Sequence, residues 1–133
     1  MKRAVAPQAL IKFKQRVREL TSRTCGRSVK QMIERLDGYL VGWKGYFQLA
    51  DTPGVFAELD SWIRRRLRMV YLKQWKQSET CYRELTVRGL SPRAAMSITA
   101  AHRSYWRIAG TSGMNVVFPN SCFDDLGLTR LGA

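Results

Sequence analysis

The residues best suited to chemistry are basic and aromatic side chains between Trp62 and Gln77, and that chemistry is non-covalent. If a helix runs to Gln77, its register divides them between an outer face and its edges. Arg64, Arg65, Arg68 and Lys76 share the outer face, Arg66 and Lys73 lie at its edges, and Trp75 lies over Arg64 and Arg68. Guanidinium groups can grip phosphates and an indole can stack on a base, so the pattern favours contact with nucleic acid. The alternative is a solvated basic face with Trp75 packed on a neighbouring element.

The side chains that usually perform covalent chemistry form no recognisable constellation. His102 has no nucleophile motif beside it and is better explained as a surface or packing residue. Asp124 and Asp125 are adjacent, so on a helix they would not face each other, and no third carboxylate motif accompanies them. The three cysteines are widely spaced and lack a pair motif. We therefore expect no catalytic residues, no metal site and no cofactor.

Composition favours a polyanionic partner. The 133 residues carry 23 Lys and Arg against 10 Asp and Glu, a formal net charge of +13. Nineteen of the basic and eight of the acidic side chains fall in residues 1–90, so the excess belongs to the first two-thirds of the chain. No apolar run is long enough for a membrane span, and we expect no membrane partner. Unpaired cysteines suit a reducing compartment, which agrees with a cytoplasmic location.

Apolar spacing predicts an all-α fold, with a compact bundle of three main helices and a loop-rich C-terminal extension of short helices. We divide the chain into a basic lead-in (1–7), a helical domain (8–90) and the extension (91–133). The third helix begins at Pro53 with Thr52 as its N-cap, a short fourth helix spans 78–88 and ends before Gly89, and Ser91-Pro92 opens a fifth through residue 101. Residues 105–108 are expected to be an apolar anchor within a loop.

The second predicted helix combines an apolar face with a stripe of glycines. Ser28 followed by Gln31 is a capping-box pattern for its start. Its apolar face consists of Val29, Met32, Ile33, Leu36, Leu40, Trp43 and Phe47. Gly38, Gly42 and Gly45 fall together on the opposite face, where another backbone could approach closely. The competing interpretation is that these glycines only kink or end the helix.

Several motifs in this order resemble the maturase-specific domain of group II intron-encoded proteins, also called domain X, the thumb of their reverse transcriptase. They are Arg27-Ser28, Leu40-Val41-Gly42-Trp43-x-x-Tyr46-Phe47, Leu59-Asp60-x-Trp62-Ile63-Arg64-Arg65-Arg66-Leu67-Arg68 and Lys73-x-Trp75-Lys76. Tyr105-Trp106-Arg107 and Asn120-x-x-Phe123-x-x-Leu126-Gly127-Leu128 resemble the tail of bacterial members. The resemblance covers about residues 7–131 and implies a thumb-like helical fold from a bacterial mobile element.

The resemblance implies binding of structured group II intron RNA, which would assist intron folding and splicing. In a full-length relative the same platform would grip a primer–template duplex, so an RNA/DNA duplex is a further expected partner. Backbone contacts are expected from Lys14, Arg16, Arg23, Arg27, Lys30, Lys44, Arg64, Arg65, Arg66, Arg68, Lys73 and Lys76, and stacking from Tyr46 and Trp75.

The chain departs from the family in its enzymatic parts. The Tyr/Phe-x-Asp-Asp motif of the reverse-transcriptase palm is missing, because Cys122 stands where Phe123-Asp124-Asp125 would need its aromatic residue. No endonuclease cassette follows. We therefore expect no enzymatic activity from this chain alone, although it resembles a part of RNA-directed DNA polymerases.

Two other functions stay open at this point. One is an orphan thumb that docks as a protein-interaction module on a separate reverse-transcriptase fingers and palm chain. The other is a non-functional remnant of a truncated intron reading frame. An exposed apolar patch formed by Tyr39, Tyr46, Ile108 or Phe118 would favour the docking function.

Overall fold

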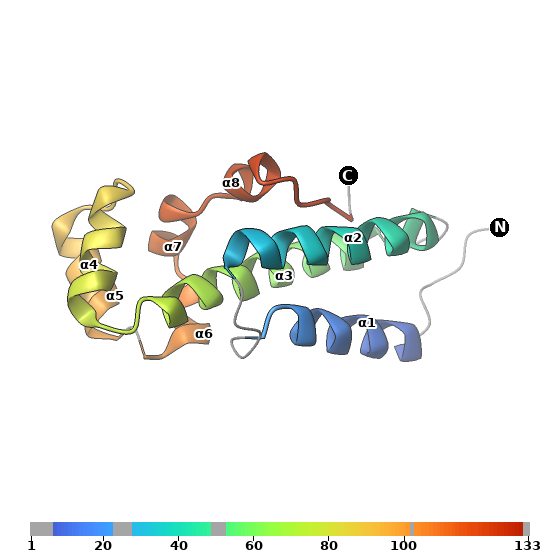
Figure 1. Ribbon diagram of the computed structural model, residues 1–133, viewed down its shortest axis with the longest axis horizontal. Coiled ribbons are helices and arrows are strands. Elements are labelled where there is room, and N and C mark those ends of the chain that lie inside the picture. The colour runs from blue at the N-terminus through green and yellow to red at the C-terminus, as the bar shows by residue number, and fades with distance from the viewer. Residues whose placement is uncertain (1–6, 23–27, 49–52, 102, 132–133) are drawn as a thin grey trace.

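The computed structural model describes residues 7–22, 28–48, 53–101 and 103–131, and every regular element in these ranges is a helix (Figure 1). In chain order the helices are α1 (Pro7–Leu20), α2 (Val29–Gln48), α3 (Pro53–Gln74), α4 (Ser78–Val87), α5 (Pro92–Ala100), α6 (Tyr105–Ala109), α7 (Ser112–Val117) and α8 (Asn120–Asp125). The predicted all-α class is confirmed.

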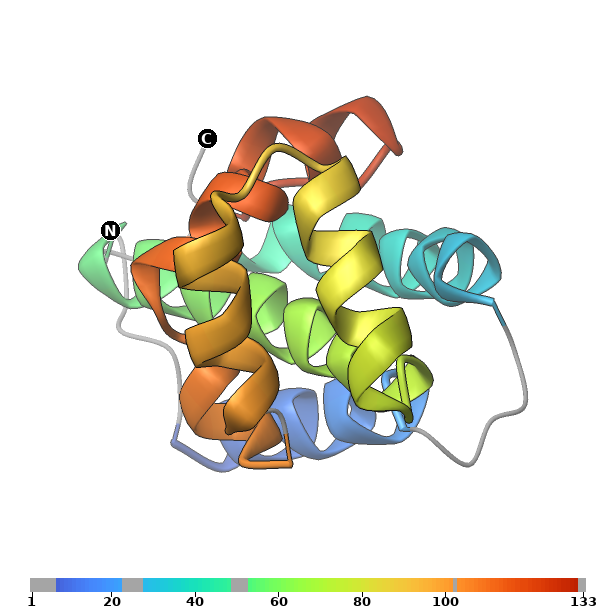
Figure 2. The same cartoon turned by 90° about the vertical axis from the view of Figure 1, so that its left-hand side faces the viewer.

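The three long helices form an antiparallel bundle, and the short helices surround α3. Helices α1, α2 and α3 run in alternating directions, while α4 and α5 stand across the end of α3 (Figure 1). Seen from that end, α6 lies low beside α1, and α7 and α8 lie on the opposite side of α3 (Figure 2). Helix α3 therefore has neighbours on both sides, which decides where its basic side chains can go.

Local sequence signals explain where several helices begin and end. At the start of α2, Ser28 N donates to Gln31 Oε1 (3.3 Å) and Gln31 N donates to Ser28 Oγ (3.2 Å), so the predicted capping box is confirmed. Ser91 Oγ accepts from Ala94 N (3.3 Å) at the start of α5. Gly89, with φ +97°, follows the end of α4 in a conformation that disfavours side chains. The predicted cap Thr52 lies outside the described residues.

One hydrophobic core joins the bundle to the C-terminal helices. Leu36, Ile63 and Leu67 are fully buried between the long helices, and Phe123 from α8 and Leu131 beyond it belong to the same cluster. Residues 91–131 thus contribute to the interior of the bundle instead of forming a separate lobe. The predicted apolar face of α2 is buried from Val29 to Leu40, with Trp43 half-buried; the side chain of Phe47 is not among those described.

The glycine stripe of α2 lies on an open face. The helix continues past Gly38, Gly42 and Gly45, and no heavy atom of the described residues lies within 4 Å of where a Cβ would stand on any of them. The interpretation that these glycines end the helix is therefore wrong for this chain.

Two predicted elements differ from those observed. Helix α3 ends at Gln74, three residues before Gln77, and Trp75 then turns into the core with only 7% of its surface exposed. Tyr105 to Ala109 form helix α6 and not a loop. In both places packing on a distant part of the chain fixes the conformation, which local spacing does not reveal.

Candidate nucleic-acid interface

The four arginines between Arg64 and Arg68 leave α3 in two directions. Successive residues of an α-helix are about 100° apart, so neighbouring side chains cannot all share one face. Arg64 and Arg68 point toward the C-terminal segment, whereas Arg65 and Arg66 contact residues of α6 and of the end of α1, respectively. The two groups have different environments.

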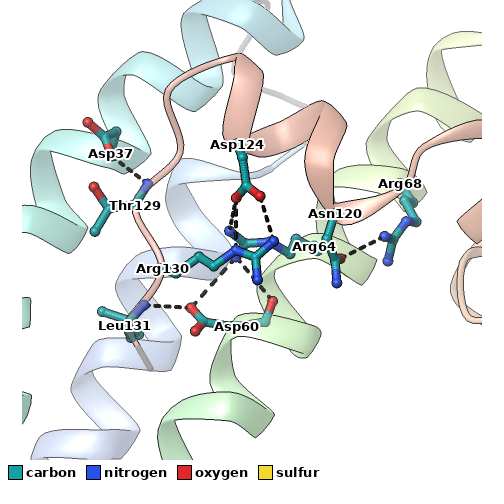
Figure 3. A network of polar contacts seen from close by, with 9 residues as sticks. All are labelled: Asp37, Asp60, Arg64, Arg68, Asn120, Asp124, Thr129, Arg130 and Leu131. Atoms are coloured by element: carbon teal, nitrogen blue, oxygen red, sulfur yellow. Dashed lines mark hydrogen bonds and ion pairs between the residues drawn. The ribbon is translucent and has the colours of Figure 1, made fainter. Parts of the chain in front are cut away.

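Arg64 and Arg68 belong to what we call the C-terminal clamp, which comprises Asp60, Arg64, Arg68, Asn120, Asp124 and Arg130 (Figure 3). Arg64 is 2% exposed and lies between two carboxylates, 3.6 Å from Asp60 Oδ1 and 3.5 Å from Asp124 Oδ1. Arg130 holds Asp124 from the other side, with Nε–Oδ1 at 2.9 Å and Nη2–Oδ2 at 2.5 Å. The buried charge of Arg64 is therefore compensated within the protein.

Arg68 fixes the chain that leads into α8. Its Nε donates to the carbonyl oxygen of Phe118 (2.8 Å) and its Nη2 to Asn120 Oδ1 (3.1 Å). Burial lowers the pKa of Arg68, and the like charge of Arg64 lowers it further. Burial is also the main reason that the pKa of Arg64 is lowered, against the opposing effect of Asp60 and Asp124.

Carboxylates also hold the backbone of the tail, the segment that follows α8. Asp37 on α2 accepts a hydrogen bond from Thr129 N (2.8 Å), and Asp60 on α3 accepts one from Leu131 N (2.9 Å). Two helices of the bundle thus satisfy amide groups of a segment that has no regular structure of its own. These bonds lay the tail along the side of α3 from which Arg64 projects.

The prediction that Arg64, Arg68 and Trp75 share an outward-facing surface is wrong. Arg64 and Arg68 are 2% and 5% exposed, because residues far along the chain cover that side of α3. Trp75 stacks on Phe118, with ring centroids 5.8 Å apart, and Arg88 lies 5.3 Å from the Trp75 ring centroid. These three side chains are enclosed by the protein and cannot reach RNA without unfolding around them.

The opposite side of α3 gathers cations around an indole. The charged groups of Lys14 and Arg18 from α1 and of Arg66 from α3 lie 5.7, 5.4 and 5.7 Å from the ring centroid of Trp62. Attraction to the electron-rich ring holds these like charges near one another. The result is a local concentration of positive charge at the junction of α1 and α3.

This junction opens into a groove of about 470 Å³ that we call the cationic groove. It is lined by Arg18, Trp62, Arg66, Met69, Lys73 and Trp106. Among the described residues no acidic side chain lines it. A groove with cations and indoles on its walls suits a ligand with negative charge and flat rings.

Arg66 is fixed in its place in the groove. Its Nε donates to Thr21 Oγ1 (2.8 Å), and the Thr21 hydroxyl in turn donates to the carbonyl oxygen of Val17 (2.7 Å). Burial lowers the pKa of Arg66, and the nearby charge of Arg18 lowers it further. An anion in the groove would offset both effects.

Arg65 fixes the other wall. Its Nε and Nη2 donate to the carbonyl oxygen of Trp106 at 3.0 and 2.7 Å, and its guanidinium lies 4.0 Å from the Trp106 ring centroid. Trp106 nevertheless keeps 39% of its surface exposed. Because Arg65 fixes both the backbone and the ring of Trp106, the part of this indole that is open to solvent is a preorganised surface for stacking.

The remaining predicted contact residues are scattered. Arg16 pairs with Glu19 on the surface of α1 (2.9 Å), and Lys73 lies 5.9 Å from the ring centroid of Tyr105. Lys30, Lys44 and Tyr46 are on α2, away from the groove, and Lys76 is exposed beyond the end of α3. Arg23 and Arg27 lie outside the described residues. Of the predicted set, Arg66 and Lys73 line the groove, and Lys14 lies beside it over the Trp62 ring.

Sequence reasoning missed four groove residues, Arg18, Trp62, Met69 and Trp106. A signal was available for the first three, because Lys14 and Arg18 are four residues apart and Trp62, Arg66, Met69 and Lys73 follow at i, i+4, i+7 and i+11. Trp106 carried no such signal, since only the packing of α6 against α3 brings it to this groove.

The patch that would have favoured docking on another protein is not formed. Ile108 and Phe118 are 4% and 3% exposed and belong to the core, and Tyr39 is half-buried against it. Tyr46 is 44% exposed and packs edge-on against Trp43, with ring centroids 5.3 Å apart.

Metal-binding and membrane-spanning features are absent from the described part of the chain. No three His, Cys, Asp or Glu residues there come together as metal ligands would. Asp124 is engaged by two arginines, and His102 lies outside the described residues. None of the described helices has the length and apolarity needed to cross a bilayer.

The fold and the groove define a basic, all-helical domain in which the cationic groove and the C-terminal clamp lie on different sides of α3. Residues 10–89 match the group II intron, maturase-specific domain, so the chain belongs to this family. The match spans α1 to α4 and includes every groove residue except Trp106. It identifies the maturase-specific domain and no enzymatic domain. No curated protein matches the chain.

Proposed function

We propose that this chain is an RNA-binding maturase domain that assists the folding and splicing of a group II intron, with the cationic groove as its main contact. The observation that carries the proposal is the convergence of Lys14, Arg18 and Arg66 on Trp62, at the edge of a groove that Arg18, Arg66 and Lys73 line. Membership in the maturase-specific family supplies the class of RNA. The site of action in this proposal is the bacterial cytoplasm.

Electrostatics explain why a folded intron suits this surface. Packed RNA helices crowd phosphates together, and a protein that brings fixed cations to them replaces condensed counterions. Two cations of the groove are held in place, Arg18 by the Trp62 indole and Arg66 by a hydrogen bond to Thr21, so they lose little conformational entropy when they contact phosphate. The domain would stabilise the compact RNA fold without taking part in bond breaking.

Binding to a folded group II intron RNA, measured across a salt series, tests the proposal. Lys14, Arg18 and Lys73 are replaced together by glutamine, which removes three charges without touching Arg66 or the clamp. We expect the affinity for the intron to fall roughly 100-fold and the slope of log K against log salt to become shallower by about 2 to 3, because each of the three lost phosphate contacts contributes roughly 0.7–0.9.

The control removes the same charge elsewhere. Arg35, Arg83 and Arg93 are exposed and none of them lines the groove, and replacing all three by glutamine gives an equal net charge. This control should change affinity less than threefold and support splicing as well as the unaltered chain. Equal losses in both triple variants would refute a localised site, and equal binding of intron, duplex DNA and unrelated structured RNA would refute the maturase function.

A further inference from the structure

Two kinds of recognition chemistry meet at the cationic groove. Arg18, Arg66 and Lys73 offer positive charge, and the indole of Trp106, with the Arg65 guanidinium over one face, is still 39% exposed. Trp62 contributes in a different way, since three cations already lie within 6 Å of its ring centroid and its role is to position them. The groove thus combines several cations with one partly exposed indole, whose remaining face is not covered by Arg65.

We infer that the groove holds one unstacked nucleotide of the bound RNA, with its phosphate among Arg18, Arg66 and Lys73 and its base against the indole of Trp106. This inference rests on the proposed function and names the structural element of the RNA that the groove recognises. Bulged or looped nucleotides supply such an element, whereas a base inside a continuous duplex does not.

The dimensions of the groove support a single nucleotide. Its volume of about 470 Å³ lies within the range of roughly 300–1,000 Å³ of sites that enclose small ligands. A duplex could touch the rim with its phosphates, but its bases are stacked on one another and their faces are not available. Only an unpaired base can leave the stack and enter.

The fixed position of Trp106 supports a stacking role. Arg65 holds it through two hydrogen bonds to its carbonyl oxygen and through contact with its ring. Gly110, at the end of α6, leaves space for this guanidinium, because a Cβ there would lie 2.8 Å from the Arg65 Cζ. The indole therefore meets a base without first losing side-chain freedom.

The test uses two RNA hairpins that are identical except for one unpaired nucleotide in the stem of the second. Binding is measured by fluorescence anisotropy for the unaltered chain, Trp106→Ala, Trp106→Phe and the control Met96→Ala, which shortens an exposed side chain on α5. A 2-aminopurine at the unpaired position reports stacking through the quenching of its fluorescence.

The unaltered chain should bind the bulged hairpin roughly 10-fold more tightly than the paired one, the effect expected for stacking one base. Trp106→Ala should lose this preference and the quenching while its affinity for the paired hairpin changes less than twofold. Trp106→Phe should keep most of both, and Met96→Ala all of both.

Three results would overturn the inference: equal affinity of the unaltered chain for the two hairpins, quenching that persists in Trp106→Ala, or an equal loss of affinity for both hairpins in that variant. The first comparison needs no variant, so a folding defect in Trp106→Ala cannot obscure the answer. Preference for folded intron over unrelated RNA is measured in parallel. If that preference persists without a bulge preference, only the nucleotide pocket is wrong; if it is lost, the maturase function is wrong.

Discussion

Replacing Arg64 by methionine separates a structural role of this arginine from a role in RNA contact. Methionine preserves most of the length of the side chain and removes the charge. In the structure the charge is 2% exposed and lies 3.6 Å from Asp60 and 3.5 Å from Asp124. The substitution would remove the cation that lies 3.6 Å from Asp60 Oδ1, on a carboxylate side chain that is 14% exposed.

Removing one partner of a buried ion pair typically costs 3–5 kcal/mol, because the remaining charge is left uncompensated. The lower end applies to Arg64, since Asp124 is partly exposed and keeps Arg130 as a partner. We therefore expect Arg64→Met to lower the free energy of unfolding by about 3 kcal/mol. For a domain of this size that corresponds to a decrease in Tm of about 10 °C.

Urea unfolding followed by far-UV circular dichroism measures this change, with Arg93→Met on the exposed surface of α5 as the matched control. The control should alter stability by less than about 0.5 kcal/mol. At a temperature where Arg64→Met remains folded, its affinity for intron RNA should match that of the unaltered chain. A variant with unchanged stability and lost RNA binding would refute the reasoning and place Arg64 on the RNA.

Two further predictions concern the contacts that hold the C-terminal helices. Arg130 holds the pKa of Asp124 below its usual range, so the stability contributed by Asp124 is complete above about pH 4 and is lost as the pH falls through the lower, folded-state pKa. In thermal unfolding, the difference in Tm between the unaltered chain and Asp124→Asn should therefore shrink below pH 4, and a difference that is constant from pH 7 to pH 2 would contradict this linkage. Gly110→Ala should displace the guanidinium of Arg65 and destabilise the fold by about 1.5–3 kcal/mol, the contribution of a hydrogen bond to a charged group. Because the two residues share that contact, Gly110→Ala should cost much less in an Arg65→Ala background; additive effects in this double-mutant cycle would show that the contact is absent.

Local signals in the sequence predicted the helices well. The Ser28–Gln31 capping box and the Ser91-Pro92 start act through hydrogen bonds between residues three apart, so their outcome depends little on the remainder of the fold. The apolar periodicity of α2 similarly identified Met32, Ile33 and Leu36 as core residues.

The candidate site was harder to predict, because it depends on contacts between distant residues. Periodicity places Arg64 and Arg66 on different parts of α3, but it does not tell which part the tail covers. Arg64 is covered by Asp124, 60 positions later, whereas Arg66 meets Thr21, 45 positions earlier. The sequence therefore predicts RNA contact for all four arginines, although Arg64 and Arg68 are enclosed by the fold.

The C-terminal clamp bears on how fragments of this protein should be interpreted. The family match ends at residue 89, which makes a truncation near residue 90 an obvious choice for expression. Such a fragment would lose Asn120 and Asp124 together with the apolar residues of the tail, and would leave Arg64 and Arg68 uncovered. Its newly exposed guanidinium groups would bind any nucleic acid, so a shortened chain that binds RNA more strongly than the longer one would indicate damage to the protein and not an improved maturase.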